Sequence, residues 1–154
     1  MDKLTHLGRQ SSEPTDKLDL IEWKGAPIRI ALNCLEFTSH CPVTNQPDFG
    51  QLVIEYIPGA HIAETKSVKL YLWRFRAQAA FNEQIANEIA DDFYTQLNPS
   101  FVRVTLRMNA RGGIAVTATA TRRRERDTLG LDIKQVPQEL PCAADVDEAG
   151  ERTA

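Results

Sequence analysis

Cys41 and Asp48 are the two residues of this sequence whose types and spacing best suit covalent chemistry. They lie in segment 41–49, which reads Cys-Pro-Val-Thr-Asn-Gln-Pro-Asp-Phe. A thiolate can attack an electrophilic carbon, and a neighbouring carboxyl group can supply or accept the proton that the attack requires. Because Pro42 and Pro47 restrict the backbone on both sides, the sequence predicts a stiff loop that holds the pair.

The same residues also have structural interpretations. A single cysteine is often a small buried apolar side chain, and an aspartate beside a proline can hydrogen-bond within a turn. Spacing alone therefore leaves both roles open for Cys41 and Asp48. Cys34 lies within an apolar run and is interpreted as a core residue, and Cys142 as an incidental thiol of the C-terminal segment.

The composition narrows the class of protein. The chain has 154 residues, of which 42% are hydrophobic and 25% charged, as expected of one globular domain. No apolar run approaches the roughly 18 residues that cross a membrane, and the N-terminus lacks an apolar signal region, so we expect a cytoplasmic protein. A net charge of −3 gives no reason to expect direct nucleic-acid binding.

The cysteines and histidines do not form a metal-binding pattern. There are three of each, and the histidines, His6, His40 and His61, are scattered. Neither the zinc-type spacing nor the even number of cysteines typical of a disulfide framework is present. The sequence therefore predicts no metal and reduced thiols, as in the cytoplasm.

The hydrophobic periodicity predicts two strands, two helices and two strands, in that order. Segments with strand-like alternation or β-rich composition are 28–37, 51–57, 101–108 and 114–121. Segments with apolar residues three and four apart, typical of helices, are 64–78 and 81–97. The residues 41–48 form a loop between the first two strands. Arg111-Gly112-Gly113 predicts a hairpin turn between the last two.

This order predicts an α+β fold. Each strand pair can be antiparallel, with both helices on one face of a four-stranded sheet. Open edge strands allow subunits to join edge to edge into a barrel. We expect the domain over 27–124, after a polar, irregular N-terminal arm (1–26) and before a polar, disordered C-terminal tail (125–154).

Three motifs in this order carry a resemblance to a known family. They are segment 36–49 around Cys41, segment 64–71 (Glu-Thr-Lys-Ser-Val-Lys-Leu-Tyr), and Phe81-Asn82-Glu83 followed by 111–114. Together they resemble the NADPH-dependent 7-cyano-7-deazaguanine reductases, in their short single-module form, from about Leu7 to Ile114. The resemblance implies the tunnelling fold (T-fold), whose ββααββ unit has the order expected above. It also implies a homo-oligomeric barrel with sites between neighbouring subunits.

The resemblance implies a reaction and a set of site residues. A nitrile reductase of this family reduces 7-cyano-7-deazaguanine to a primary amine with two NADPH, in making queuosine for transfer RNA. Cys41 would form a thioimide with the nitrile carbon, and Asp48 would donate protons. The residues implied for binding the 7-deazapurine substrate are Glu83, Asn82 and Phe81. Those implied for binding NADPH are Glu64, Thr65, Lys66, Ser67 and Lys69, and His40 and Lys66 are candidates for favouring the Cys41 thiolate.

One departure from the family keeps other functions open. Family members usually have histidine directly before the glutamate, where this chain has Asn82, and an amide cannot shuttle a proton. A first alternative is a relative that adds ammonia to the thioimide and forms an amidine. A second is a purine- or pterin-binding module without turnover. The absence of a G-x-G-x-x-G sequence argues against a Rossmann-type cofactor site.

Overall fold

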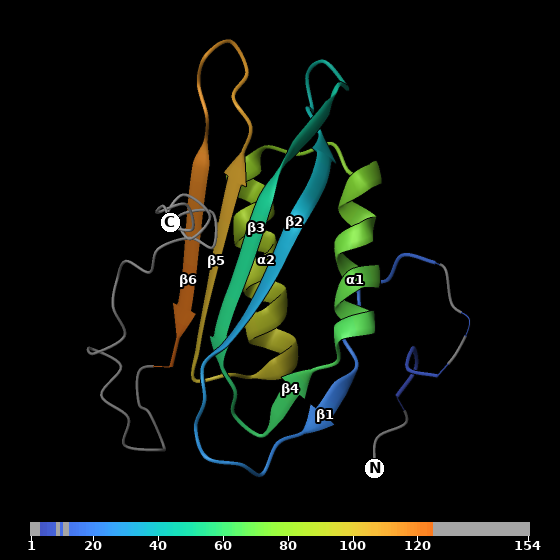
Figure 1. Cartoon of the computed structure of the whole chain (residues 1–154), viewed down its shortest axis with the longest axis vertical. Helices are drawn as coiled ribbons and strands as arrows, with labels where there is room; N and C mark the ends of the chain where they lie inside the picture. Colours follow the sequence, from blue (N-terminus) through green and yellow to red (C-terminus); the bar gives the residue numbers. More distant parts are fainter. Residues whose placement is uncertain (1–3, 9, 11–12, 125–154) are drawn as a thin grey trace, which may run out of the picture. The chain divides into compact units, whose positions relative to one another are not determined.

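The computed structural model describes residues 4–8, 10 and 13–124, which form a mixed α+β fold (Figure 1). Its main sheet has four strands in the order β2-β3-β5-β6, all neighbours being antiparallel. These strands are β2 (Ile30–His40), β3 (Pro47–Ile57), β5 (Phe101–Met108) and β6 (Thr117–Arg123). The predicted four-stranded sheet and its antiparallel strand pairs are confirmed.

Two helices separate the strand pairs. The first, α1 (Thr65–Trp73), continues into a short 3₁₀ helix, η1 (Arg74–Ala77), and the second is α2 (Asn82–Leu97). Helix α2 ends at Asn98, whose φ of 51° is left-handed, directly before Pro99. Helix α2 packs on β5 and β6, while η1 contacts β2. Both helical segments predicted from the sequence are thus present, with the end of the first one tightened into a 3₁₀ turn.

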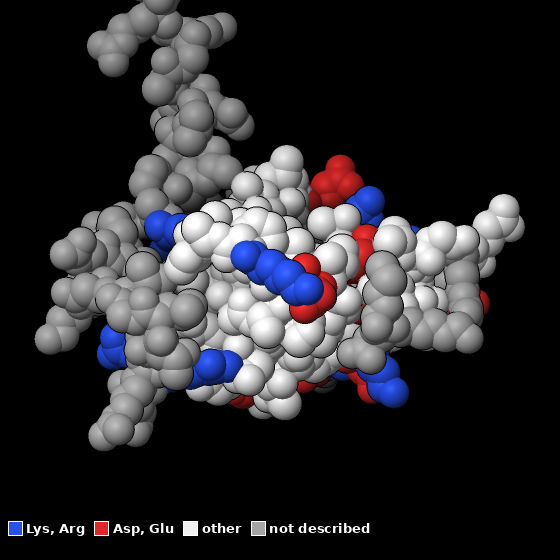
Figure 2. Space-filling view, turned by 90° about the horizontal axis from the view of Figure 1, so that it is seen from below, with Lys and Arg blue, Asp and Glu red and all other residues white. Residues whose placement is uncertain are grey.

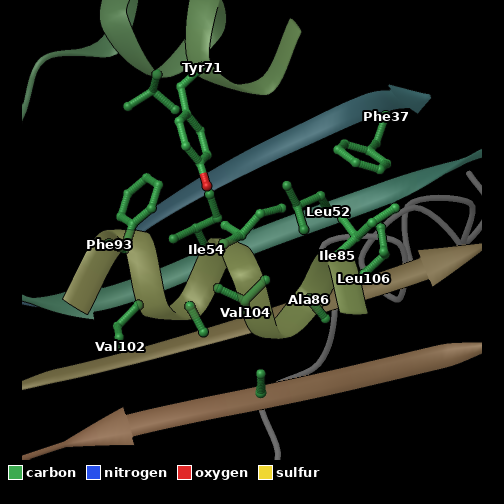
Figure 3. Packing of buried hydrophobic residues seen from close by; sticks show 14 of the residues in the cluster. Phe37, Leu52, Ile54, Tyr71, Ile85, Ala86, Phe93, Val102, Val104 and Leu106 are labelled. Carbon is green, nitrogen blue, oxygen red and sulfur yellow. The ribbon is translucent and has the colours of Figure 1, made fainter. Parts of the chain in front are cut away.

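The core lies between the sheet and the helices (Figure 3). The fully buried residues of α2 recur at spacings of three and four, as an amphipathic helix requires. They meet alternate residues of the two central strands, Leu52 and Ile54 from β3 and Val102, Val104 and Leu106 from β5. Tyr71 of α1 packs edge-on against Phe93 of α2, with ring centroids 5.9 Å apart. This layer fixes both helices on one face of the sheet.

A β-bulge interrupts β2. Cys34 pairs with Leu52 and Phe37 pairs with Gly50, so that Leu35 and Glu36 together face only Gln51. The bulge adds one residue to the strand. The side chains that face the core are therefore at even-numbered positions up to Cys34 and at odd-numbered positions, Phe37 and Ser39, after it. The sequence alternation fades at this point, which is why the strand was predicted to end at Phe37 although it continues to His40.

Several element boundaries differ from the prediction. The segment 1–26 was expected to be irregular, but Leu20–Glu22 form β1, which pairs with β4 (His61–Ala63) in a separate two-stranded sheet. Strand β3 begins at Pro47, so Asp48 lies in a strand and not in the loop, because Ser39 and Asp48 are still paired. Strand β6 begins at Thr117 and not at Ile114, because Ile114 closes a turn with Arg111.

Other expectations concern the ends and the surface of the chain. The polar tail 125–154, including Cys142, lies outside the described residues, and the domain limits 27–124 stay a prediction. Within the described part, no helix has the length and apolar character needed to cross a membrane. At the end of the molecule seen in Figure 2, the described basic and acidic side chains are scattered over a largely uncharged surface.

Candidate functional site

Two hairpin loops lie at the same end of the sheet (Figure 1). One joins β2 to β3 and carries Cys41, and the other joins β5 to β6 and carries Arg111. They are neighbours because β3 and β5 pair up to Gly50 and Met108 at this end. The backbone N–H of Asn109 extends the contact by donating to the carbonyl of Phe49 at 2.8 Å. The sheet thus brings together residues that are about seventy positions apart in the sequence.

The Cys41 loop is closed by its own backbone. The N–H of Cys41 donates to the carbonyl of Gln46 at 2.9 Å, and the N–H of Asn45 donates to the carbonyl of Cys41 at 2.9 Å. Asn45 has a φ of 54°, in the left-handed region that asparagine tolerates better than most residues. The chain therefore folds around Cys41, which is half-buried directly after the end of β2.

Arg111 connects the two loops. Its Nη1 donates to Oδ1 of Asp48 at 2.8 Å, and its Nη2 donates to Oε1 of Gln46 at 2.8 Å. The same guanidinium lies close to the Cys41 thiol and helps to lower its pKa. The side chain of Asp48 is only 11% exposed, whereas that of Arg111 is 46% exposed. One cation thus contacts both members of the predicted catalytic pair.

The loop favours the thiolate form of Cys41. Hydrogen bonds from the Thr44 hydroxyl and from the backbone N–H groups of Thr44 and Val43 lower the pKa of Cys41 to about 7. Burial opposes this change, and the Arg111 guanidinium adds to it. An ordinary cysteine has a pKa near 8.5, so this thiol ionises in the neutral range, where the thiolate is the nucleophile.

Arg111 is a candidate site residue to which the sequence interpretation gave no role. His40 and Lys66 were the expected influences on the thiol, but Lys66 Nζ instead donates to the carbonyl of His6 at 2.8 Å. Arg111 entered the sequence interpretation as part of a turn and of the motif 111–114, without a role at the thiol. In the structure Gly112 and Gly113 have φ values of 58° and 84°, as a type I′ turn needs, and Arg111 and Ile114 exchange backbone hydrogen bonds across it. This tight turn fixes the direction in which Arg111 leaves the hairpin.

The start of α2 lies at the same end of β2 as Cys41. His40 pairs with Ala79 in a parallel bridge, its N–H donating to the Gln78 carbonyl and its carbonyl accepting from the Ala80 N–H, both at 3.2 Å. Helix α2 begins soon afterwards. The three predicted substrate-binding residues follow directly after this bridge, which joins their segment to the residue before Cys41. They are Phe81, which is 53% exposed, Asn82 and the exposed Glu83. Their role stays a prediction.

The start of α1 is capped by the side chain of Glu64, one of the residues expected to bind NADPH. Glu64 is buried and caps the helix, its carboxylate accepting from the N–H groups of Lys66 and Ser67 at 2.8 Å each. The Ser67 hydroxyl donates to the Glu64 carbonyl at 2.7 Å. The backbone N–H groups of Lys66 and Ser67 are thus already paired with the protein's own carboxylate.

Thr65 and Lys69 lie on the surface of the protein, whereas Glu64 and Ser67 are buried. Both are exposed and line a groove between α1 and β2 of about 730 Å³. Leu72 and Trp73 of α1 contribute apolar walls, and Arg76 adds a second positive charge. Pockets of this size accommodate cofactor-sized molecules. Direct contact of the five predicted residues with a cofactor stays a prediction. Among the described residues, no three His, Cys, Asp or Glu side chains gather as ligands for a metal ion.

Comparison with known proteins gives consistent matches. The sequence model of the family described as "QueF-like protein" matches residues 47–127. A protein of Thioalkalivibrio sulfidiphilus named NADPH-dependent 7-cyano-7-deazaguanine reductase is 43% identical over 115 residues, covering 73% of this chain and 89% of the relative. A protein of the same name from Frankia casuarinae is 43% identical over 122 residues, covering 79% of this chain and 98% of the relative.

A solved structure shares the fold. The archaeosine synthase QueF-Like, crystallised in the apo form, matches with a TM-score of 0.59 over 63% of this chain and 95% of its own. Its sequence is 23% identical, so the likeness concerns the fold alone.

Proposed function

The chain belongs to the QueF-like family, with NADPH-dependent 7-cyano-7-deazaguanine reductases among its relatives, and we propose that it reduces the nitrile of 7-cyano-7-deazaguanine to a primary amine. The reaction is a step towards queuosine in transfer RNA. NADPH supplies, when bound, the hydride for each of the two reductions that this four-electron change requires. The residues of the chain bind and activate the nitrile.

Cys41 is the nucleophile of the proposed reaction. Its sulfur forms a bond to the nitrile carbon while one π bond of the nitrile breaks, and the thiol proton ends on the nitrogen, giving a covalent thioimide. The carbon–nitrogen double bond of the thioimide accepts hydride more readily than the original triple bond. Release of the thiolate after the first reduction leaves an imine for the second.

Asp48 moves the protons of these steps. It lies on the second strand of the hairpin whose loop holds Cys41. Arg111 hydrogen-bonds the Asp48 carboxylate and also helps to lower the pKa of the Cys41 thiol. A carboxylate in this position can accept the thiol proton and donate it to the nitrogen as negative charge develops there. Arg111 keeps the carboxylate oriented while it does so. This shared contact of Arg111 with the thiol and the carboxylate is the observation that carries the proposal.

Glu83 is proposed to bind the heterocycle. Its carboxylate can accept two hydrogen bonds from the ring N–H and the exocyclic amine of a guanine-like edge. Glu83 lies in the exposed first turn of α2, with Asn82 and Phe81 beside it. The exposed ring of Phe81 offers an apolar face against which a flat heterocycle can pack.

NADPH is proposed to bind along α1 and in the groove beside β2. Lys69 and Arg76 line this groove and can neutralise phosphate charge, while Thr65 offers a hydroxyl. Lys66 contributes a further cation at the helix start. Glu64 and Ser67 contribute by holding that start in shape, as their hydrogen bonds to each other indicate.

The protein is proposed to work as a homo-oligomer. Strands β2 and β6 are the two edges of the main sheet, and Leu35 of β2 is 64% exposed. Edge strands with exposed apolar side chains favour pairing with another chain. Edge-to-edge joining of such sheets into a barrel, with sites between neighbouring subunits, would complete the partly open groove.

An amidine-forming reaction is the main alternative, and Asn82 is the observation that favours it. If the amide cannot replace the histidine usual at this position in proton delivery, the thioimide would persist until another nucleophile such as ammonia attacks it. The cationic, hydroxyl-bearing motif on α1 favours the reductase. A purine- or pterin-binding module without turnover would form no adduct on Cys41 at all.

Product analysis separates these reactions. The protein is incubated with 7-cyano-7-deazaguanine, NADPH and an ammonium salt, and the small-molecule products are identified by mass spectrometry. The proposed function predicts the primary amine in the wild type and neither product in Cys41→Ala. Formation of the amidine would establish the alternative, and unchanged nitrile without a protein adduct would support the binding module.

A further inference from the structure

Asp19 binds the N-terminal segment from inside the protein. Its side chain is 4% exposed and accepts hydrogen bonds from the Thr5 hydroxyl at 2.9 Å, the His6 N–H at 2.6 Å and the Leu7 N–H at 3.4 Å. Nδ1 of His6 lies 3.0 Å from the same carboxylate. Burial acts to raise the pKa of Asp19, but the hydrogen bonds from the backbone of His6 and Thr5 and from both side chains outweigh it and lower the pKa to about 2. The carboxylate is thus ionised at neutral pH.

The backbone of Asp19 is fixed to the start of α1. Its N–H donates to the Ser67 hydroxyl at 2.9 Å, and its carbonyl accepts from the Glu64 N–H at 2.9 Å. Both partners belong to the capped helix start described above. Asp19 therefore joins segment 5–7 on one side to the motif 64–69 on the other.

Lys66 gives a second link between the same two parts. Its ammonium donates to the carbonyl of His6 at 2.8 Å. His6 in turn is held by the Asp19 carboxylate through both its backbone N–H and its ring. The place of the Lys66 ammonium thus depends on segment 5–7, and the place of this segment depends on Asp19.

We propose that Asp19 is a positioning residue for the NADPH site, acting by holding segment 5–7 against Lys66 at the start of α1. This inference rests on the proposed function, since the site is taken to be the one that Lys66, Thr65 and Lys69 form for NADPH. A cation held in advance of binding contributes more to affinity than one that must be ordered on binding. Loss of Asp19 leaves the donors of segment 5–7 without their acceptor and weakens the hold of this segment on the Lys66 ammonium. The reaction of Cys41 with the nitrile does not involve this part of the protein.

The test compares two kinetic quantities in the same variants. Steady-state kinetics give the KM for NADPH, and intact-mass analysis without NADPH gives the rate at which the nitrile forms an adduct on Cys41. In Asp19→Asn we expect the KM for NADPH to rise about tenfold, the equivalent of one hydrogen bond to a charged group. We expect kcat at saturating NADPH and the adduct rate to stay within about twofold, because the catalytic loops are untouched.

Thr5→Val is a milder second variant. It removes one donor to Asp19 from an exposed residue and keeps the side-chain shape, so folding should be unaffected even if Asp19→Asn is unstable. We expect a rise in the KM for NADPH of about threefold. Glu55→Gln serves as the control for general destabilisation, since Glu55 is a buried carboxylate paired with Arg29 and Arg103 on the main sheet. It should lower the melting temperature without raising the KM for NADPH.

The outcomes separate this inference from the proposed function. A wild-type protein that forms the adduct but consumes no NADPH would overturn both. Wild-type turnover with an unchanged KM in Thr5→Val and in Asp19→Asn, if the latter folds, would overturn the role of Asp19 alone. A KM raised equally in Glu55→Gln would also overturn it, because the effect would then follow stability.

Discussion

At the scale of single residues, the proposed chemistry depends on a thiol whose ionisation is favoured by its own loop. Hydrogen bonds from the Thr44 hydroxyl and from the N–H groups of Thr44 and Val43 lower the pKa of the thiol. Arg111, which is paired with Asp48, adds a positive charge. Because these groups favour the charged form, Cys41 can be a nucleophile at neutral pH without a histidine partner. The pH dependence of its reactivity is therefore informative.

Arg111→Gln should raise the pKa of Cys41, because it removes the cation while leaving the Thr44 and Val43 donors. In the wild type, the rate of alkylation by iodoacetamide should rise with pH around a midpoint of about 7. In the variant the midpoint should move upward, and turnover at neutral pH should fall about tenfold or more. Arg107→Gln, an exposed arginine on the same hairpin, is the matched control and should leave the midpoint in place. An unchanged midpoint in Arg111→Gln would contradict the role assigned to Arg111.

At the scale of secondary-structure elements, the site depends on how closely β3 and β5 approach. Gly50 pairs with Met108, and the position that a Cβ would take lies against the Arg107 carbonyl and the Met108 backbone. Only glycine fits between the two hairpins at this point, two residues after Asp48. The same contact holds the Arg111 turn over the Cys41 loop.

Gly50→Ala should therefore destabilise the fold by about 1–3 kcal/mol, because the strands must separate to admit a methyl group. Urea unfolding measures this change. Gly112→Ala is the comparison, since a Cβ there meets no atom and only the left-handed φ of 58° is unfavourable, at a cost of about 1 kcal/mol. A Gly50→Ala protein as stable as the wild type would show that the two strands are less closely packed than described.

The start of α1 should respond to acid through Asp19. Its pKa in the folded protein is about 2, below the ordinary value of 3.8, so its stabilising contribution is complete above about pH 4 and is lost as the pH falls through about 2. The difference in unfolding free energy between the wild type and Asp19→Asn should accordingly shrink over this range. Chemical unfolding at several pH values measures it, and a difference independent of pH would contradict the assignment.

Elements that depend on interactions between residues close in sequence were predicted, whereas features that depend on contacts between distant residues were not. The helices over α1 and α2 and the hairpin around Gly112-Gly113 depend on local spacing and turn chemistry, and they were predicted. Three features depend on pairing between distant strands, which periodicity does not specify: the bulge at Leu35–Glu36, the β1–β4 pair and the contact of Arg111 with Asp48. The capping role of Glu64 was likewise not predicted, because a carboxylate before a helix suits either a ligand or a cap.

At the scale of the whole molecule, the proposed oligomer would use the open edges of the main sheet. Leu35→Glu places a charge on the exposed side of edge strand β2, which should oppose edge-to-edge pairing. Sedimentation velocity should show a wild type larger than one chain and a variant shifted towards the monomer. Ile21→Glu, at an exposed apolar residue of the small sheet, should leave the distribution unchanged. A monomeric wild type would contradict the proposal of intersubunit sites.

The most direct test of the reductase is the stoichiometry of NADPH oxidation with 7-cyano-7-deazaguanine, followed by absorbance, with Cys41→Ala as the control. We predict two NADPH consumed for each nitrile in the wild type and none in the variant, which would also show that Asn82 is compatible with reduction. An adduct on Cys41 without NADPH consumption would contradict the proposed function and establish that the thioimide forms but has a different fate.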